Sequence, residues 1–198
     1  DPLWYMDEKD ANKNPTGRRV TTNDYSSADY YYVNKSSLPK VYGGFNTSLS
    51  WKGFDLSAIF AYSIGGYIYN RDITMILHNG SLEGRDWSTE ILRRWTPDNR
   101  YTDVPALSTT SNNWNSASTR FLQNNSYMRL KNLTLSYNLP KQWISKLSLS
   151  SVQVYVQGDN LFTIHRNQGL DPEQGITGIT YYRYPAMRTI SGGINVSF

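Results

Sequence analysis

Apolar and polar residues alternate with a period of two along five segments of this chain. The alternation is strictest in the last segment, residues 187–198, where Ser, Thr, Gly and Asn occupy one face. The apolar residues of the other face include Ile190, Ile194, Val196 and Phe198. Such alternation predicts a β-strand with one apolar and one polar face. A strand that ends on Phe without a polar tail is typical of an outer-membrane barrel, where one face meets lipid and the other a wet lumen.

Four further segments are predicted to be strands by the same period: residues 43–51, 54–63, 126–138 and 151–162. Only Lys52 and Gly53 separate the first two of them, and a two-residue link that contains Gly predicts a tight hairpin. Trp51 and Phe54 then face each other on the same side of the sheet. The apolar faces of the two strands therefore match without a register slip.

The segment 126–138 changes phase in its middle. Its apolar residues stand at even positions up to Leu130 and at odd positions from Leu133 onward. One extra residue in a strand produces such a shift, so we predict a β-bulge near Lys131 and Asn132.

The links between the predicted strands alternate between short and long. Bacterial barrels have short periplasmic turns and longer extracellular loops. In a soluble β-sandwich, the lengths of the links are not expected to alternate in this way. With Phe198 placed at the periplasmic end, the expected layout is an extracellular loop at 1–42, a β-hairpin at 43–63, a long extracellular loop at 64–125, a strand pair with a periplasmic turn at 126–162, an extracellular loop at 163–186 and a barrel-closing strand at 187–198.

This layout gathers aromatic residues at both ends of the strands. Tyr62 and Phe162 fall near the extracellular rim, and aromatic girdles at both membrane interfaces are expected of such barrels. The predicted periplasmic aromatic girdle consists of Trp51, Phe54 and Tyr137, at the level of Phe198.

Because five strands do not close a barrel, the rest of the wall is expected outside this chain.

Composition narrows the class of protein. Aromatic residues make up 14% of the 198 residues, with 16 Tyr and 6 Trp, which suits membrane interfaces or sugar-binding surfaces. The net charge of +4 is small and the Lys and Arg residues form no dense cluster, so no nucleic-acid partner is expected. Cysteine is absent, so disulfides play no part. A mean hydropathy of -0.58 is usual for a soluble protein, but barrel strands are apolar only at alternate positions.

Six phrases of the sequence together resemble the SusC/RagA-type TonB-dependent outer-membrane transporters. They follow one another in family order over most of residues 41–198. The phrases are VYGGFNTSLSWKGFDLSAIFAYSIGGYIYN (41–70), RRWTPDNRYTDVP (93–105), NNSYMRLKNLTLSYNLPKQW (124–143), VQVYVQGDNLFTI (152–164), GLDPE (169–173) and YPAMRTISGGINVSF (184–198).

The resemblance implies an all-β fold, a transmembrane antiparallel up-and-down β-barrel of about 22 strands. About the last five strands and their long extracellular loops would lie in this chain. It also implies a location in the outer membrane of a Gram-negative bacterium and the uptake of a glycan or oligopeptide. The implied partners are a SusD-like surface lipoprotein that acts as a lid, the TonB complex, and outer-membrane lipid. The plug domain and the TonB box are expected outside this chain.

Five aromatic residues in the predicted loops are candidates for contact with the ligand or the lid, because aromatic side chains anchor interfaces. The alternative is packing within the loops themselves. Two short helices are also expected in these loops, at 72–80 and 88–95, from the spacing of their apolar residues. The five candidates are Trp87, Trp95, Trp114, Tyr181 and Tyr182.

Two interpretations of Arg129 and Lys131 stay open. In one, both cations point outward near the rim and pair with lipopolysaccharide phosphates. In the other, which the predicted bulge favours, they face the lumen or bind a loop. Asp171 and Glu173 form either a turn or a carboxylate pair suited to glycoside hydrolysis, and the Pro and Gly residues around them favour the turn.

No motif predicts a catalytic or metal site. Asp10, Asn12 and Asn14 resemble the start of a calcium loop, but Pro15 stands where an EF-hand has Gly, so a plain turn is favoured. The two histidines lie in different loops without the spacing of zinc ligands. We therefore expect no cofactor and no enzymatic activity.

The preferred hypothesis is the barrel part of a nutrient importer. A secreted all-β carbohydrate-binding module is the alternative, because it shares the Tyr and Trp richness and the alternation. An enzyme such as a glycosidase would need activity that substitution of Asp171 or Glu173 abolishes.

Overall fold

The computed structural model describes residues 2–80, 82–108, 113–167, 169, 171–180 and 182–198. The chain divides into two compact units. The first combines Asp1–Lys35 with Asn70–Leu122, and the second combines Ser36–Tyr69 with Gln123–Phe198. The second unit contains the five long strands, whereas the described residues of the first form a hairpin, loops and short helices.

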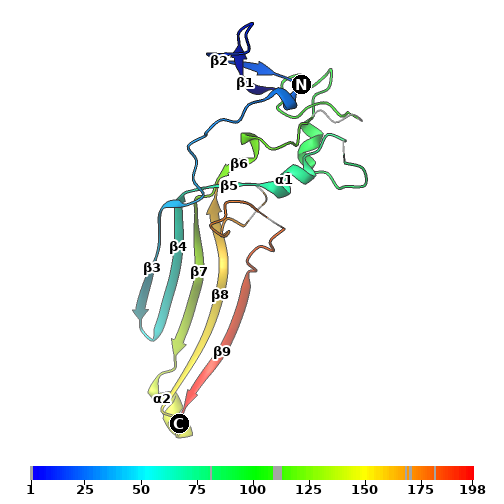
Figure 1. The fold of residues 1–198 in the computed structure, drawn as a ribbon. Helices are drawn as coiled ribbons and strands as arrows, with labels where there is room; N and C mark the ends of the chain where they lie inside the picture. Colours follow the sequence, from blue (N-terminus) through cyan, green and yellow to red (C-terminus); the bar gives the residue numbers. More distant parts are fainter. Residues whose placement is uncertain (1, 81, 109–112, 168, 170, 181) are drawn as a thin grey trace. The chain divides into compact units, whose positions relative to one another are not determined.

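The second unit is built on a five-stranded antiparallel sheet in the order β3-β4-β7-β8-β9 (Figure 1). Strands that follow one another along the chain lie side by side, apart from the short β5 and β6, so the topology is up-and-down. The expected all-β architecture with five long strands is confirmed. The strands are β3 (Pro39–Trp51), β4 (Phe54–Gly65), β7 (Tyr127–Asn138), β8 (Ser151–His165) and β9 (Thr189–Ser197).

The strands differ from the predicted segments at their ends. β3 begins at Pro39 and β8 continues to His165, beyond the predicted 43 and 162. β9 is shorter than the predicted 187–198, because its ladder with β8 begins only at the pair Asp159–Thr189. Phe198 follows β9 directly and is largely exposed.

The turn between β3 and β4 is the predicted two-residue hairpin. Lys52 and Gly53 both have positive φ, at 47° and 87°, as a type I′ turn requires. Trp51 pairs directly with Phe54, and Tyr137 of β7 continues the same row. The predicted hairpin register is therefore confirmed.

β7 contains the predicted bulge. The neighbours Ile59 and Phe60 of β4 pair with Asn132 and Leu130, so the ladder skips Lys131. The register with β8 also shifts between Leu130 and Asn132. The extra residue keeps the apolar side chains of β7 on one face on both sides of the bulge.

The register gives the sheet one apolar and one polar face. The apolar face is exposed: Leu49 is 66%, Ile190 71% and Ile194 64% exposed. The polar face carries polar and charged side chains, some of which contact the loop between β8 and β9 (residues 166–188). Residues aligned on the apolar face include Phe45, Leu49, Trp51, Phe54, Leu56, Phe60, Leu130, Leu133, Leu135, Tyr137, Val154, Val156, Phe162, Ile190, Ile194 and Val196.

Short elements flank the sheet. β5 (Tyr67–Tyr69) and β6 (Leu122–Asn124) form a separate two-stranded sheet. α2 (Lys141–Ile144) and η4 (Ser145–Leu147) make the compact link between β7 and β8. No helix within the described part of the chain has the length and apolar character to cross a membrane.

The first unit begins with a hairpin that the sequence pattern did not indicate. β1 (Trp4–Lys9) pairs antiparallel with β2 (Pro15–Thr22), and η1 (Tyr25–Ser27) follows. The region 1–42 is therefore not simply a loop. Between β1 and β2, the Asp10 carboxylate accepts hydrogen bonds from the backbone N–H groups of Asn12 and Asn14 at 2.8 and 2.9 Å. These bonds are those of a plain turn, as predicted for this segment.

Short helices order the remainder of the first unit. They are α1 (Arg71–Ile76), η2 (Thr89–Arg93) and η3 (Thr119–Phe121). α1 is shorter than the predicted 72–80, and the helix within 88–95 is of the 3-10 type. The side chain of Asn70 caps α1 by accepting a hydrogen bond from the Ile73 N–H at 3.0 Å. The buried apolar residues of this unit include Ile73, Leu77, Ile91, Val104 and Phe121.

Candidate functional site on the polar face of the sheet

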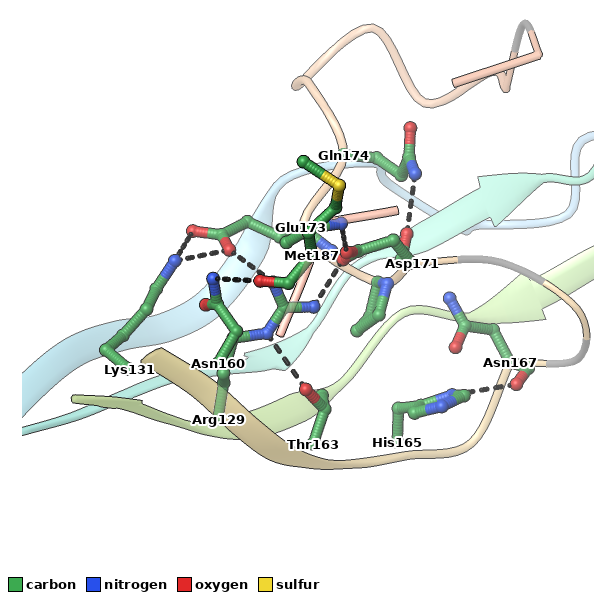
Figure 2. Close-up of polar contacts among 12 residues, drawn as sticks. Arg129, Lys131, Asn160, Thr163, His165, Asn167, Asp171, Glu173, Gln174 and Met187 are labelled. Carbon is green, nitrogen blue, oxygen red and sulfur yellow. Dashed lines mark hydrogen bonds and ion pairs between the residues drawn. The ribbon is translucent and has the colours of Figure 1, made fainter. Parts of the chain in front are cut away.

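Arg129 projects from β7 onto the polar face, and its side chain is only 3% exposed. Its Nε donates a hydrogen bond at 2.9 Å to Oγ1 of Thr163, its register partner on β8. Its two terminal nitrogens bind carboxylates of the β8–β9 loop. Nη1 donates to Glu173 at 3.0 Å and Nη2 donates to Asp171 (Figure 2). One planar guanidinium thus joins two strands and a loop.

Both carboxylate oxygens of Asp171 accept further hydrogen bonds. Oδ1 accepts from the Glu173 N–H at 2.9 Å, and Oδ2 accepts from the Ala186 N–H at 2.7 Å. Burial acts to raise the pKa of Asp171, but the N–H groups of Ala186 and Glu173 and the Arg129 guanidinium outweigh burial. The pKa therefore lies below the ordinary value of 3.8, and the carboxylate is ionised at neutral pH.

Lys131 adds a more exposed ion pair. Its ammonium group donates to Oε1 of Glu173 at 2.7 Å and also contacts Oε2. The two side chains are 32% and 38% exposed. Arg129, Lys131, Asp171 and Glu173 together form the ion-pair cluster. With two cations and two anions, the ion-pair cluster carries no net charge.

The β8–β9 loop is attached to the unit at further points. Asn125 Nδ2 donates to the carbonyl of Pro172 at 2.9 Å, and Ser37 Oγ donates to the carbonyl of Ile176 at 2.9 Å. Ile179 forms a parallel bridge with Tyr69. Because Ser37 precedes β3 and the loop begins after β8, the loop reaches from one side of the sheet toward the other.

The structure decides between the two interpretations of Arg129 and Lys131. The outward orientation toward lipopolysaccharide is wrong, because the bulge places Arg129 on the polar face and both cations bind loop carboxylates. Asp171 and Glu173 form the favoured turn. A general acid in glycoside hydrolysis needs a raised pKa, whereas the pKa of Asp171 is lowered.

A second polar feature on this face crosses all five strands, and we call it the polar row. Asp55 of β4 accepts from Ser50 of β3 and, at 2.6 Å, from Asn138 of β7. Gln153 of β8 donates to Asn138 at 3.1 Å and accepts from Asn195 of β9 at 3.2 Å. Each residue alone looks like an ordinary polar position. The polar row emerges only once the register of every strand pair is known.

The predicted periplasmic girdle residues lie at the same end of the sheet. Trp51 and Phe54 are 64% and 45% exposed, and the rings of Phe54 and Tyr137 lie 4.5 Å apart. The Lys52 ammonium lies 4.8 Å from the centre of the Trp51 ring. On β9, the register aligns Ile190, Ile194 and Val196 with the apolar face of β8. Their contact with lipid stays a prediction.

Of the five loop aromatics, Trp87, Trp95 and Trp114 belong to the first unit and Tyr182 to the second. Trp87 donates its Nε1–H to Nδ1 of the buried His78 at 3.0 Å, a pairing that the sequence did not suggest. Trp114 is 9% exposed and lies under Arg120, whose guanidinium carbon is 3.7 Å from its ring centre. Trp95 and Tyr182 are exposed, and Tyr181 lies outside the described residues. Contact with a ligand or lid stays a prediction for all five.

The described residues contain no group of three or more His, Asp or Glu side chains placed to hold a metal ion. Two cavities adjoin the β8–β9 loop. One of about 310 Å³ is lined by Tyr42, Tyr127 and Gln174, among others. The other, of about 460 Å³, adjoins the ion-pair cluster at Arg129 and Asp171.

Comparison with known sequences finds relatives among TonB-dependent receptors. The chain is 34% identical over 166 residues to "TonB-dependent receptor P3" of Formosa agariphila, which covers 78% of this chain and 16% of the relative. A second TonB-dependent receptor of that organism is 31% identical over 182 residues, 87% of this chain and 18% of the relative. SusC of Bacteroides thetaiotaomicron is 27% identical over 168 residues, 84% of this chain and 16% of SusC. No family model matches the chain.

Comparison with solved structures agrees with the comparison of sequences. The RagAB peptide importer in its closed-closed state matches 99% of this chain and 21% of its own, with a TM-score of 0.79 and 35% identity. In the open-open state the TM-score is 0.80 and the identity 34%, over 99% of this chain and 20% of the importer chain. The chain thus spans about a fifth or less of the length of these relatives. It belongs to the SusC/RagA-type TonB-dependent transporters, as a segment of their β-barrel.

Proposed function

We propose that the whole protein imports a nutrient across the outer membrane of a Gram-negative bacterium, and that this chain supplies five strands of its barrel wall. The two-faced sheet carries the proposal. Its apolar face is exposed, whereas its polar face bears the polar row and the ion-pair cluster. A wall between lipid and a water-filled lumen requires these two faces.

The arrangement of links supports a direction for the strands. The hairpin turn at Lys52–Gly53, the link at α2 and the end of β9 adjoin the same row of strand ends, and the longer loops leave the opposite ends. We propose that the end with short links is periplasmic. The interfacial aromatic residues there are Trp51, Phe54, Tyr137 and Phe198. The strand that closes the barrel is β9, which presents Ile190, Ile194 and Val196 to lipid.

An oligopeptide is the proposed nutrient, in preference to a glycan. The RagAB peptide importer, whose name states its substrate class, is 35% identical over 99% of this chain. The proposed partners are a SusD-like surface lipoprotein, which the loops of this chain would contact, and the TonB complex, which parts of the protein outside this chain would contact. Trp87, Trp95, Trp114, Tyr181 and Tyr182 are the proposed points of contact with the lipoprotein or the nutrient.

A secreted carbohydrate-binding module fits the observations less well. It would leave the apolar face of the sheet in water. Soluble monomers rarely expose contiguous apolar patches above about 300–600 Å², and this face extends over all five strands.

Uptake by intact cells tests the proposal. Deletion of the gene should abolish uptake of a labelled oligopeptide mixture, leave uptake of free amino acids unchanged, and be rescued by the intact gene. A strain without TonB should show the same loss. Peptide uptake that persists while uptake of a glycan is lost would make the nutrient a glycan. Unchanged uptake of both classes would contradict import.

A further inference from the structure

The cavity of about 460 Å³ beside the ion-pair cluster has the size of a small-ligand site. β7 and β8 supply Arg129, Thr163 and His165 to its wall. The β8–β9 loop supplies Asp171, Arg183 and Ala186. The cavity thus adjoins the polar face, beside the ion pairs that fix the loop to the sheet. Figure 2 shows these ion pairs.

The charges around this cavity do not cancel. The ion-pair cluster, in which Arg129 and Lys131 pair with Asp171 and Glu173, carries no net charge, and the Asp171 carboxylate accepts hydrogen bonds from one guanidinium and two backbone N–H groups. Arg183 also lines the cavity, and no ion pair joins it to a carboxylate within the described ranges. The surplus charge of the wall is therefore the guanidinium of Arg183.

Among the residues that the structure describes, none accepts a hydrogen bond from the guanidinium of Arg183, so its donors are available. Its Nη1 and Nη2 lie within 3.7 Å of the position that a Cβ on Gly175 would take, so the guanidinium lies over a residue that has no side chain. His165, which also lines the cavity, contacts the carbonyl of Asn167 through Nδ1 at 2.9 Å, which makes this nitrogen the donor. Nε2 of the neutral ring is then an acceptor for a peptide N–H group.

We propose that this cavity binds the side-chain carboxylate of an acidic residue in the imported peptide, and that Arg183 is the residue that selects it. The inference rests on the proposed import of peptides and adds to it a preference for negative charge. A guanidinium with free donors pairs with a carboxylate through two parallel hydrogen bonds. An amide side chain of the same shape in the peptide does not form this pair.

A randomised hexapeptide library, acetylated at the N-terminus and amidated at the C-terminus, tests the proposal without a known substrate sequence. The library is incubated with the purified full-length transporter and its lipoprotein, and the bound peptides are identified by mass spectrometry. The wild-type protein should enrich peptides that contain Asp or Glu by about fivefold over the input, the upper range for an exposed ion pair. Arg183→Gln should abolish the enrichment, and Arg183→Glu should replace it with enrichment of Lys and Arg.

Arg166→Gln is the matched control, because Arg166 is an exposed cation in the same loop that does not line the cavity. This variant should retain the enrichment. Bound peptides without any enrichment, or enrichment that survives in Arg183→Gln, would overturn the inference and leave peptide import standing. If the wild-type protein retains no peptides at all, both the inference and the proposed nutrient are wrong.

Discussion

At the scale of single residues, burial decides which charges stabilise the structure. Arg129 and Lys131 both bind Glu173, yet their side chains are 3% and 32% exposed. Removal of one partner from a buried pair costs about 3–5 kcal/mol because a charge is left uncompensated. An exposed pair contributes about 1 kcal/mol or less.

Arg129→Met in the full-length protein should therefore lower the free energy of unfolding by about 3 kcal/mol. Lys131→Met, the matched control, should lower it by less than about 1 kcal/mol. Urea unfolding of the protein in lipid vesicles, followed by tryptophan fluorescence, measures both. Equal losses would mean that the burial of Arg129 does not set the strength of the ion-pair cluster.

Because the pKa of Asp171 is lowered, its contribution to the stability of the folded state is lost on acidification. A carboxylate whose folded pKa lies below its unfolded value stabilises the folded state fully above the ordinary pKa of 3.8, and this contribution disappears as the pH falls through the folded pKa. The Ala186 amide, which donates to Asp171, should therefore keep its protection against hydrogen exchange from neutral pH down to about pH 4. Asp171→Asn should weaken this protection at every pH. Protection in the wild-type protein that already declines above about pH 5 would contradict the assignment.

At the scale of elements, the bulge in β7 keeps the two faces of the sheet separate. The ladder with β4 pairs Ile59 and Phe60 with Asn132 and Leu130 and skips Lys131. Deletion of Lys131 should therefore produce a regular ladder with β4 and leave every side chain of β7 on its present face. Deletion of Thr134, which lies in the regular part, moves one side of β7 to the wrong face.

The amount of folded full-length protein in the outer membrane, measured as a heat-modifiable band, distinguishes the two deletions. The deletion of Lys131 should assemble at close to the wild-type level, whereas the deletion of Thr134 should fail to assemble. Failure of both would mean that the bulge has a role beyond keeping the faces in phase.

Features that depend on neighbouring residues were predictable from the sequence. The five long strands, the turn at Lys52–Gly53 and the bulge all follow from a local period of two. The β1–β2 hairpin was missed because its segment is rich in polar residues, which leaves little alternation to read. The pair Arg129–Asp171 joins residues 42 apart in the chain, and no local rule brings a loop carboxylate to a strand.

At the scale of the whole molecule, the two faces of the sheet imply two different surroundings. Val156 of β8 lies on the apolar face, between Leu135 and Gly192 in the register, and is 48% exposed. Ser191 of β9 lies on the polar face, as the partner of Gln157. If lipid covers the apolar face, the cost of a charge should depend on the face and on depth in the bilayer.

Val156→Arg should therefore destabilise the full-length protein in lipid vesicles by about 2–4 kcal/mol, because the residue lies away from both strand ends, near the expected bilayer centre. Val152→Arg, on the same face near the short-link end of the sheet, should cost about 0–1 kcal/mol. Ser191→Arg, on the polar face, should cost little. Urea unfolding measures all three. In a soluble module, Val156 would already face water, and Arg there would be tolerated. Small, equal effects in the three variants would thus overturn the membrane assignment, whereas a loss confined to Val156→Arg requires a nonpolar surrounding on one face alone.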